Sequence, residues 1–162
     1  MNYLKRYFIP ILLILFLSGC GYNIHRSSDI NNRTVYLRNV DNVTTEPGLQ
    51  DIFRTVFLEE ALNHGIRLDK GGIVLDITIT EYDLKTVTVK KDRSVEYSVN
   101  LLADVHIEYP DGITRDINRL SPEFMETFIA QESVQSIQAE REVTTVKALR
   151  DLSQRIIIEL IY

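Results

Sequence analysis

Cysteine and histidine are the side chains that most often act as nucleophiles, metal ligands or proton carriers, and this chain has few of them. It contains one cysteine, Cys20, and three histidines, His25, His64 and His106. The histidines do not have the short mutual spacing that metal sites use. We therefore expect no metal site and no cofactor, and Cys20 is the one residue whose type suggests covalent chemistry.

The acidic residues show no catalytic pattern. Asp76, Glu81, Asp83 and Glu96 are spread along segments that the sequence predicts to be exposed faces of strands. Gly71–Gly72 is an isolated pair before a strand and does not form a phosphate-binding motif. The formal net charge of −5 provides no overall positive field to hold nucleic acid. We therefore expect a protein that is not an enzyme and does not bind nucleic acid.

One basic cluster stands against this acidity. Lys85, Lys90, Lys91 and Arg93 surround a charged turn between two predicted strands. Such a cluster can keep a hairpin end soluble and block the pairing of exposed strand edges. It can also bind an anion, because lysine and arginine side chains contact phosphates well.

The amino-terminal segment differs sharply from the rest of the chain. Lys5 and Arg6 precede an uncharged run of eleven residues, YFIPILLILFL, followed by the small residues Ser18 and Gly19. A transmembrane helix needs roughly 20 apolar residues. The pattern therefore predicts a secretory signal peptide over residues 1–19, with a short uncleaved membrane helix as the alternative.

Cys20 stands at the end of this segment. The stretch Leu17-Ser18-Gly19-Cys20 resembles the bacterial lipobox, in which the thiol receives diacylglycerol and the new amino terminus is usually acylated. A free thiol is the alternative, and a disulfide within the chain is excluded because Cys20 has no partner. We expect Cys20 to carry lipid and residues 20–32 to be a polar tether. The absence of Asp after Cys20 favours the outer membrane.

Periodicity predicts the remaining elements. Alternation of apolar and polar residues indicates strands, and apolar residues at helical spacing indicate two helices. Thr44 or Thr45 can cap the first helix, and Gly65 is placed to end it. Pro110-Asp111-Gly112 predicts a tight turn. The predicted strands cover 33–40, 72–80 with a possible continuation to 89, 95–109, and 113–120 with a possible continuation to 128. The predicted helices cover 47–64 and 133–162.

These elements predict one α+β domain over residues 33–162. Two helices would pack on one face of a four-stranded, mostly antiparallel mixed sheet, as a two-layer sandwich. The first strand, first helix and second strand would form a crossover unit. A coiled coil is the alternative for the last helix, but its heptads are irregular.

The order of motifs resembles the LptE family of lipopolysaccharide-assembly lipoproteins. The resemblance rests on Cys20-Gly21-Tyr22, on the helix end LNHGIRL, and on the strands GGIVLDITITEYD and EYSVNLLADVHIEYPDG. It implies an outer-membrane lipoprotein without enzymatic activity that occupies the lumen of an LptD-like β-barrel, assists its assembly and helps deliver lipopolysaccharide to the cell surface.

The resemblance also implies that the protein binds lipopolysaccharide. Its phosphates would then be the anion for Lys85, Lys90, Lys91 and Arg93. The competing hypothesis is an outer-membrane lipoprotein that acts as an adaptor in another envelope or secretion complex. Tyr36, Tyr82 and Phe124 are either ordinary sheet residues, which we favour, or anchors of a protein interface.

Overall fold

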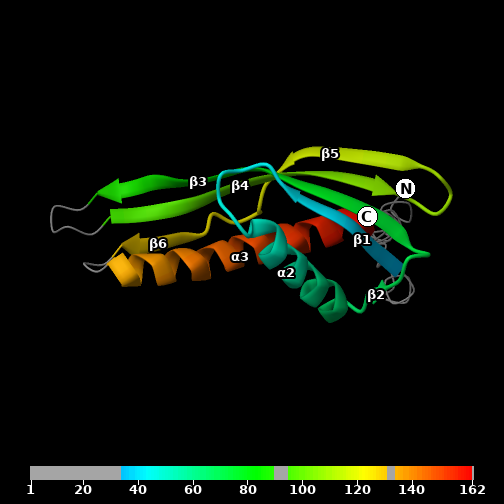
Figure 1. The fold of residues 1–162 in the computed structure, drawn as a ribbon, viewed down its shortest axis with the longest axis horizontal. Helices are drawn as coiled ribbons and strands as arrows, with labels where there is room; N and C mark the ends of the chain where they lie inside the picture. Colours follow the sequence, from blue (N-terminus) through cyan, green and yellow to red (C-terminus); the bar gives the residue numbers. More distant parts are fainter. Residues whose placement is uncertain (1–33, 90–94, 131–133, 162) are drawn as a thin grey trace, which may run out of the picture.

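The structure, a computed structural model, describes residues 34–89, 95–130 and 134–161. Within these residues the chain forms a layer of strands and a layer of helices (Figure 1). The elements in chain order are β1 (Thr34–Asn42), α2 (Leu49–Asn63), β2 (Arg67–Leu68), β3 (Ile73–Val89), β4 (Val95–Glu108), β5 (Thr114–Leu120), β6 (Thr127–Ala130) and α3 (Val134–Ile161).

The strands form one mixed sheet in the order β2-β1-β3-β4-β5, and β6 also pairs with β4. β1 runs parallel to both β2 and β3, whereas β4 is antiparallel to β3, β5 and β6. Parallel neighbours need a crossover connection, and α2 supplies it between β1 and β3. The predicted mixed sheet and crossover unit are therefore confirmed.

The predicted number of four strands is wrong, because the sheet formed by the described residues has six. β1, β3, β4 and β5 match the four predicted strands. The fifth is β2, which has two residues and is too short to produce a periodic pattern. The sixth is β6, which occupies the same edge of β4 as β5 does, but farther towards the β3–β4 turn.

β5 and β6 are two parts of one edge, separated by the loop 121–126. The backbone of Arg119 has φ 55, a left-handed conformation that non-glycine residues rarely adopt, and its N–H donates to Asp104 at 2.7 Å. Pro122 follows and has no N–H to give to a ladder. The strand therefore stops at Leu120. Phe124, which we expected in a sheet, lies in this loop with 66% of its surface exposed.

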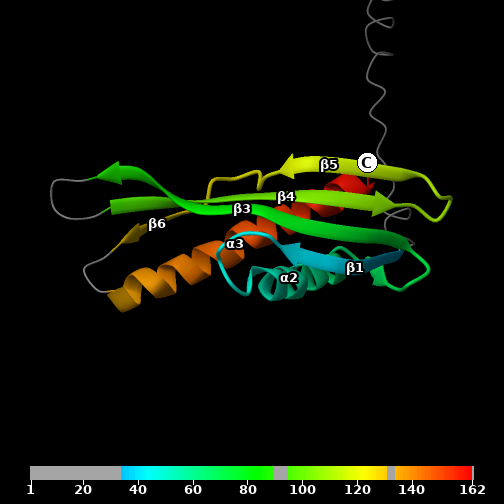
Figure 2. The same ribbon diagram turned by 45° about the horizontal axis from the view of Figure 1, so that its top comes forward.

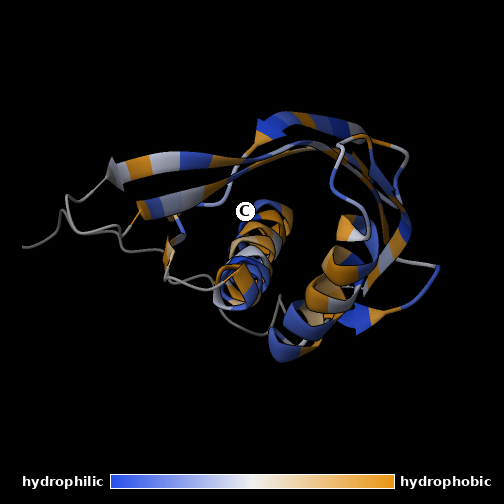
Figure 3. Cartoon of the chain, turned by 60° about the vertical axis from the view of Figure 1, so that its left-hand side comes forward, coloured by the Kyte–Doolittle hydropathy of each residue, from blue (hydrophilic) through white to orange (hydrophobic). Residues whose placement is uncertain are grey.

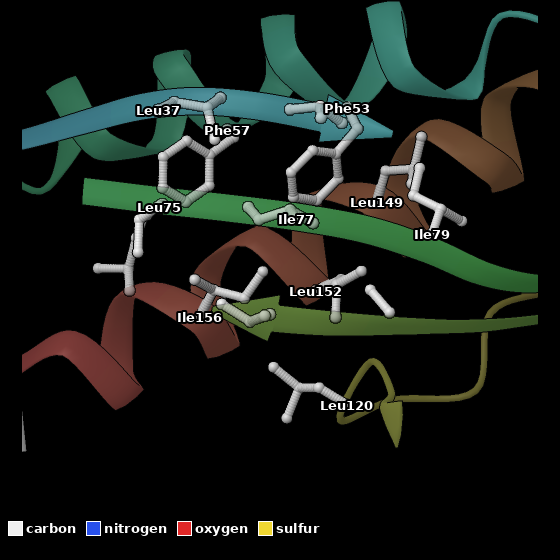
Figure 4. Close-up of a cluster of buried hydrophobic side chains, with 14 of the residues drawn as sticks. Leu37, Phe53, Phe57, Leu75, Ile77, Ile79, Leu120, Leu149, Leu152 and Ile156 are labelled. Carbon is white, nitrogen blue, oxygen red and sulfur yellow. The ribbon is translucent and has the colours of Figure 1, made fainter. Parts of the chain in front are cut away.

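Both helices lie on one side of the sheet (Figure 3). α2 packs against β1 and α3, while α3 packs against β4 and β6. The core between the layers is built from aromatic and branched aliphatic side chains (Figure 4). Its fully buried members include Phe53, Phe57, Leu75, Ile77, Leu149, Leu152 and Ile156.

The ends of α2 follow the sequence only in part. Its N-cap is Gly48, with φ 80, so the predicted caps Thr44 and Thr45 are wrong. The Thr44 hydroxyl instead donates to Asn42 at 2.7 Å and accepts from the Glu46 N–H, which forms a turn before the helix. Gly65, with φ 73, ends the helix as predicted. The Gly65 and Ile66 N–H groups donate to the carbonyls of residues 62 and 61, as in a Schellman motif.

The apolar stripe predicted for α3 is buried only in its second part. The buried residues begin at Thr144, whereas Val134 and Val143 are 69% and 52% exposed. Leu62, near the end of α2, is 60% exposed. The start of α3 extends past α2 (Figure 1), and its buried residues begin only at Thr144.

A β-bulge changes which side chains of β3 face the helices. Ile79 pairs with Ala103, but Glu81 pairs with Leu102, so Thr80 is the extra residue. Before the bulge the odd-numbered residues Ile73 to Ile79 are buried. After it, Tyr82 and Leu84 pair with Leu101 and Val99 and lie on the helix side. The sequence predicted a possible continuation of this strand to Val89, but not this reversal.

We predict that Gly71 and Gly72 respond differently to alanine. A Cβ at Gly72 would collide with the backbone carbonyl of Thr34, because β1 and β3 come together there, whereas a Cβ at Gly71 would only meet Asp69 at an ordinary 3.9 Å. Gly72→Ala should lower the free energy of unfolding by about 1–3 kcal/mol. Gly71→Ala should leave it nearly unchanged. Denaturant unfolding of the two full-length variants measures this, and equal stabilities would contradict the close approach.

Candidate functional site

The basic cluster begins on a hairpin arm that extends beyond β1. The arm consists of β3 after Ile79 and the facing part of β4, with β6 beside it (Figure 2). Lys85 is exposed there and pairs with Ser98. Lys90, Lys91 and Arg93 lie outside the described residues, as does Cys20. The joint action of the four basic residues and the lipidation of Cys20 therefore stay predictions.

A crevice of about 380 Å³ lies at the base of the arm. The start of α2 contributes Leu49 and Ile52 to one wall, the first part of α3 forms the opposite wall, and Tyr82 comes from β3. Polar side chains line the rest of it. They are Glu46, Gln138, Arg141, Glu142 and Thr145.

The hydroxyl groups at this crevice form a closed ring of hydrogen bonds. The Thr145 hydroxyl lies 2.8 Å from the carbonyl of Arg141 and 2.8 Å from the hydroxyl of Tyr82. Because the Thr145 proton goes to the carbonyl, the Tyr82 hydroxyl donates to Thr145 Oγ1. It then accepts from Arg141 Nε, 3.3 Å away. Each polar atom is satisfied, which ties β3 to α3.

Arg141 completes this tie electrostatically. Its guanidinium lies over the Tyr82 ring, 5.7 Å from the centroid, and forms an ion pair with Glu46. The hydrogen bond from Arg141 to Tyr82 is the main reason that the pKa of Arg141 is raised, and Glu46 raises it further. The Arg141 side chain therefore keeps its charge. The turn before α2, the arm and α3 are therefore held together at one point.

Sequence reasoning missed this arrangement. The sequence singled out no role for Arg141, and Tyr82 was described only as a sheet residue or an anchor. The signal that decides both is the bulge at Thr80, which turns Tyr82 towards α3. A bulge of this kind leaves no periodic mark, because one inserted residue resembles ordinary variation within a strand.

The opposite face of the sheet carries ion pairs between neighbouring strands. Arg38 contacts Asp76 at 2.5 Å and Glu108 at 3.3 Å. The hydrogen bond from Arg38 is the main reason that the pKa of Asp76 is lowered. His106 lies 2.5 Å from Asp116, and its side chain is 40% exposed. These exposed pairs contribute to strand register more than to stability.

The described residues hold no group of three or more metal-ligating side chains. No helix among them is long and apolar enough to span a membrane. The main surface features of the described residues are a projecting arm, a crevice at its base and a polar sheet face.

Comparison with known proteins identifies the family. The family model described as "LptE: Lipopolysaccharide-assembly" matches residues 32–160, which include every strand and almost all of the last helix. The chain belongs to the LptE family. The resemblance seen in the sequence is thereby confirmed. No curated protein sequence matches the chain.

Two solved lipoprotein structures are similar to this LptE-family chain. The rare lipoprotein B of Shewanella oneidensis has a TM-score of 0.53 at 11% identity, over 79% of this chain and 93% of that one. A minor lipoprotein of Acinetobacter baumannii has a TM-score of 0.44 at 15% identity, over 79% and 91% of the two chains. Only the first TM-score exceeds 0.5, so only that likeness carries weight, and at 11% identity it concerns the fold alone.

We predict that Tyr82→Phe breaks the ring of hydrogen bonds at the crevice. The change removes the donor to Thr145 and the acceptor of Arg141, and it should lower the free energy of unfolding by about 0.5–1.5 kcal/mol. Tyr36→Phe is the matched control, because the contact of Tyr36 with Lys70 uses the ring, 5.9 Å from the lysine nitrogen. Denaturant unfolding compares them. An equal effect of the two changes would show that the Tyr82 hydroxyl stabilises nothing.

Proposed function

We propose that this LptE-family protein is an outer-membrane lipoprotein that partners an LptD-like β-barrel. It would occupy the lumen of the barrel, assist its assembly and help deliver lipopolysaccharide to the outer leaflet. The match of residues 32–160 to a lipopolysaccharide-assembly family is the observation that carries this proposal. The fold shared with the rare lipoprotein B of Shewanella oneidensis supports it. The proposed action is binding and positioning, without catalysis.

The proposal includes lipid on Cys20. A diacylglycerol and an N-acyl chain together give stable anchoring, whereas a single acyl chain binds a membrane only marginally. The anchor then needs no spanning helix, and residues 20–32 link it to β1. The mass of the mature amino-terminal peptide tests this step, because lipidation adds the mass of the acyl chains.

Lipopolysaccharide is the proposed anionic ligand of the basic cluster. Lys85 is exposed on the described part of the arm, and Lys90, Lys91 and Arg93 follow it in sequence. Lysine and arginine form charge-assisted hydrogen bonds with phosphate oxygens, which the lipid would supply. In this proposal, lipopolysaccharide binding depends on the surface charge of one hairpin end and needs no cofactor.

We predict that a large β-barrel co-purifies with this protein after mild detergent extraction of its native outer membrane. Tagged full-length protein is the bait, and mass spectrometry identifies the partner. A barrel of the LptD type is the expected result. Recovery of a different envelope complex without a barrel would contradict the proposal and favour the adaptor hypothesis.

We also predict that reversing three charges at the arm weakens lipopolysaccharide binding. Lys90→Glu, Lys91→Glu and Arg93→Glu together should reduce affinity by about tenfold or more, since each lost charge-assisted contact contributes about 1 kcal/mol or more. The control reverses Arg54, Lys70 and Lys147, which gives the same net charge elsewhere on the molecule.

The affinity of each full-length variant for purified lipopolysaccharide is the measurement that tests this prediction. Circular dichroism shows whether each variant is folded. A similar loss of affinity in both variants would indicate a general effect of net charge, and unchanged affinity in the arm variant would exclude the arm as the lipid site.

A further inference from the structure

The outer edge of β3 is open along the arm. β1 covers this edge only as far as Ile79, whose carbonyl accepts from the Val43 N–H at 3.1 Å. β4 occupies the other edge of β3 along its length. From Thr80 to Val89, no described strand pairs with the outer edge, and none lies beside it in Figures 1 and 2. An open edge presents backbone donors and acceptors that can pair with another strand.

The last part of the open edge of β3 carries fewer charges than the other long open edge. β5 carries Arg115, Asp116 and Arg119 among its seven residues, and charged side chains discourage pairing at an edge. The last part of β3 reads LKTVTV and has Lys85 as its single charge, while Glu81 and Asp83 precede it on the same open edge. Thr86, Val87 and Thr88 are exposed there. Threonine and valine are residues that favour strand pairing.

Two irregularities delimit the segment that can pair. The register of β3 with β4 shifts between Ile79 and Glu81, and again between Thr86 and Thr88. A bulge bends a strand and ends regular pairing. The straight part of the open edge is therefore the segment 81–86, centred near Leu84. A strand added here would bend away at its own bulge, close to the place where β1 ends.

The charges within this segment are complementary to those of a second copy. Asp83 and Lys85 are both exposed and flank Leu84 on the face opposite the helices. If two copies pair antiparallel around Leu84, Asp83 of each lies opposite Lys85 of the other. The pairing then contains two opposite-charge cross-strand contacts, with Leu84 opposite its own copy and Tyr82 opposite Thr86. A twofold contact requires such self-complementarity.

We propose that two copies of this chain associate through the open edge of β3, antiparallel and centred on Leu84. The contact joins the sheets of the two copies into one continuous sheet. Each copy contributes one short strand to the contact. The surface area buried in it is therefore much smaller than the roughly 1,600 Å² of a standard stable interface. The dimer is therefore weak, and its population rises with protein concentration. The association does not depend on the proposed barrel or lipid ligand.

Charge exchange tests both the partner and the register. Asp83→Lys gives an edge with two basic side chains and Lys85→Glu gives an edge with two acidic ones, so each variant alone should dimerise about tenfold more weakly than the wild type. An equimolar mixture of the two variants should associate at least as well as the wild type, because the basic edge of one variant then faces the acidic edge of the other. The double variant Asp83→Lys/Lys85→Glu should also regain association.

Sedimentation velocity over a range of concentrations measures these dissociation constants. The full chain is used with detergent in large molar excess, so that two copies rarely share a micelle by chance. Glu123→Lys and Lys147→Glu, which are exposed positions outside the edge, make the matched control pair. Restored association in the mixture, absent from the control pair, supports the proposal. Monomeric wild type at the highest concentration, or equal association of all variants, overturns it.

Discussion

β3 is seventeen residues long, whereas its parallel neighbour β1 has nine, and much of this structure follows from that difference. While β1 is alongside, β3 has a partner on both edges and buries its apolar face under the helices. After β1 ends, β3 continues with β4 alone on one side. A two-stranded ribbon is marginally stable by itself. The arm therefore depends on additional contacts, and the bulge at Thr80 makes them possible by turning Tyr82 and Leu84 towards the helix layer.

The last helix serves both parts of the sheet. Its second part closes the main core with Leu149, Leu152 and Ile156, all fully buried. Its first part lies beneath the arm, where apolar burial is incomplete and polar contacts replace it. The ring through Tyr82, Thr145 and Arg141 supplies directional contacts at that point. β6 supports the arm from the other edge, and Phe128 stacks on Tyr97 there, with ring centroids 5.5 Å apart.

This architecture suits a protein whose proposed work is positioning. In the main body, each face of the sheet is occupied by a packed core or by ion pairs between strands. The arm is the part that extends away from this body, and it carries Lys85 on its surface and an open strand edge along its side. The family match gives the arm a context, lipopolysaccharide assembly, in which charge and shape would act without bond-making chemistry.

Local features of the chain could be predicted from the sequence, because each is decided by a few neighbouring residues. Alternation predicted β3 and β4, and helical spacing predicted both helices. Gly65 ends α2 because glycine adopts a positive φ without strain. Gly112, at φ 84, closes the turn after Pro110, where its N–H donates to the Tyr109 carbonyl at 2.9 Å. In each of these cases, the residue that determines the local structure lies only a few positions in sequence from the feature that it determines.

The tertiary structure decided what depends on distant partners. The extra strands β2 and β6 exist because β1 and β4 offer edges to them, and neither is long enough to show a period of its own. The cap of α2 moved to Gly48 because Asn42 and Thr44 form a turn with each other. The bulge at Thr80 arises from the pairing of two strands. Such pairing between distant segments cannot be predicted from the residue pattern of either strand alone. That single residue reverses the side chains of the arm, brings Tyr82 to Arg141, and leaves Asp83 and Lys85 on the opposite, exposed face.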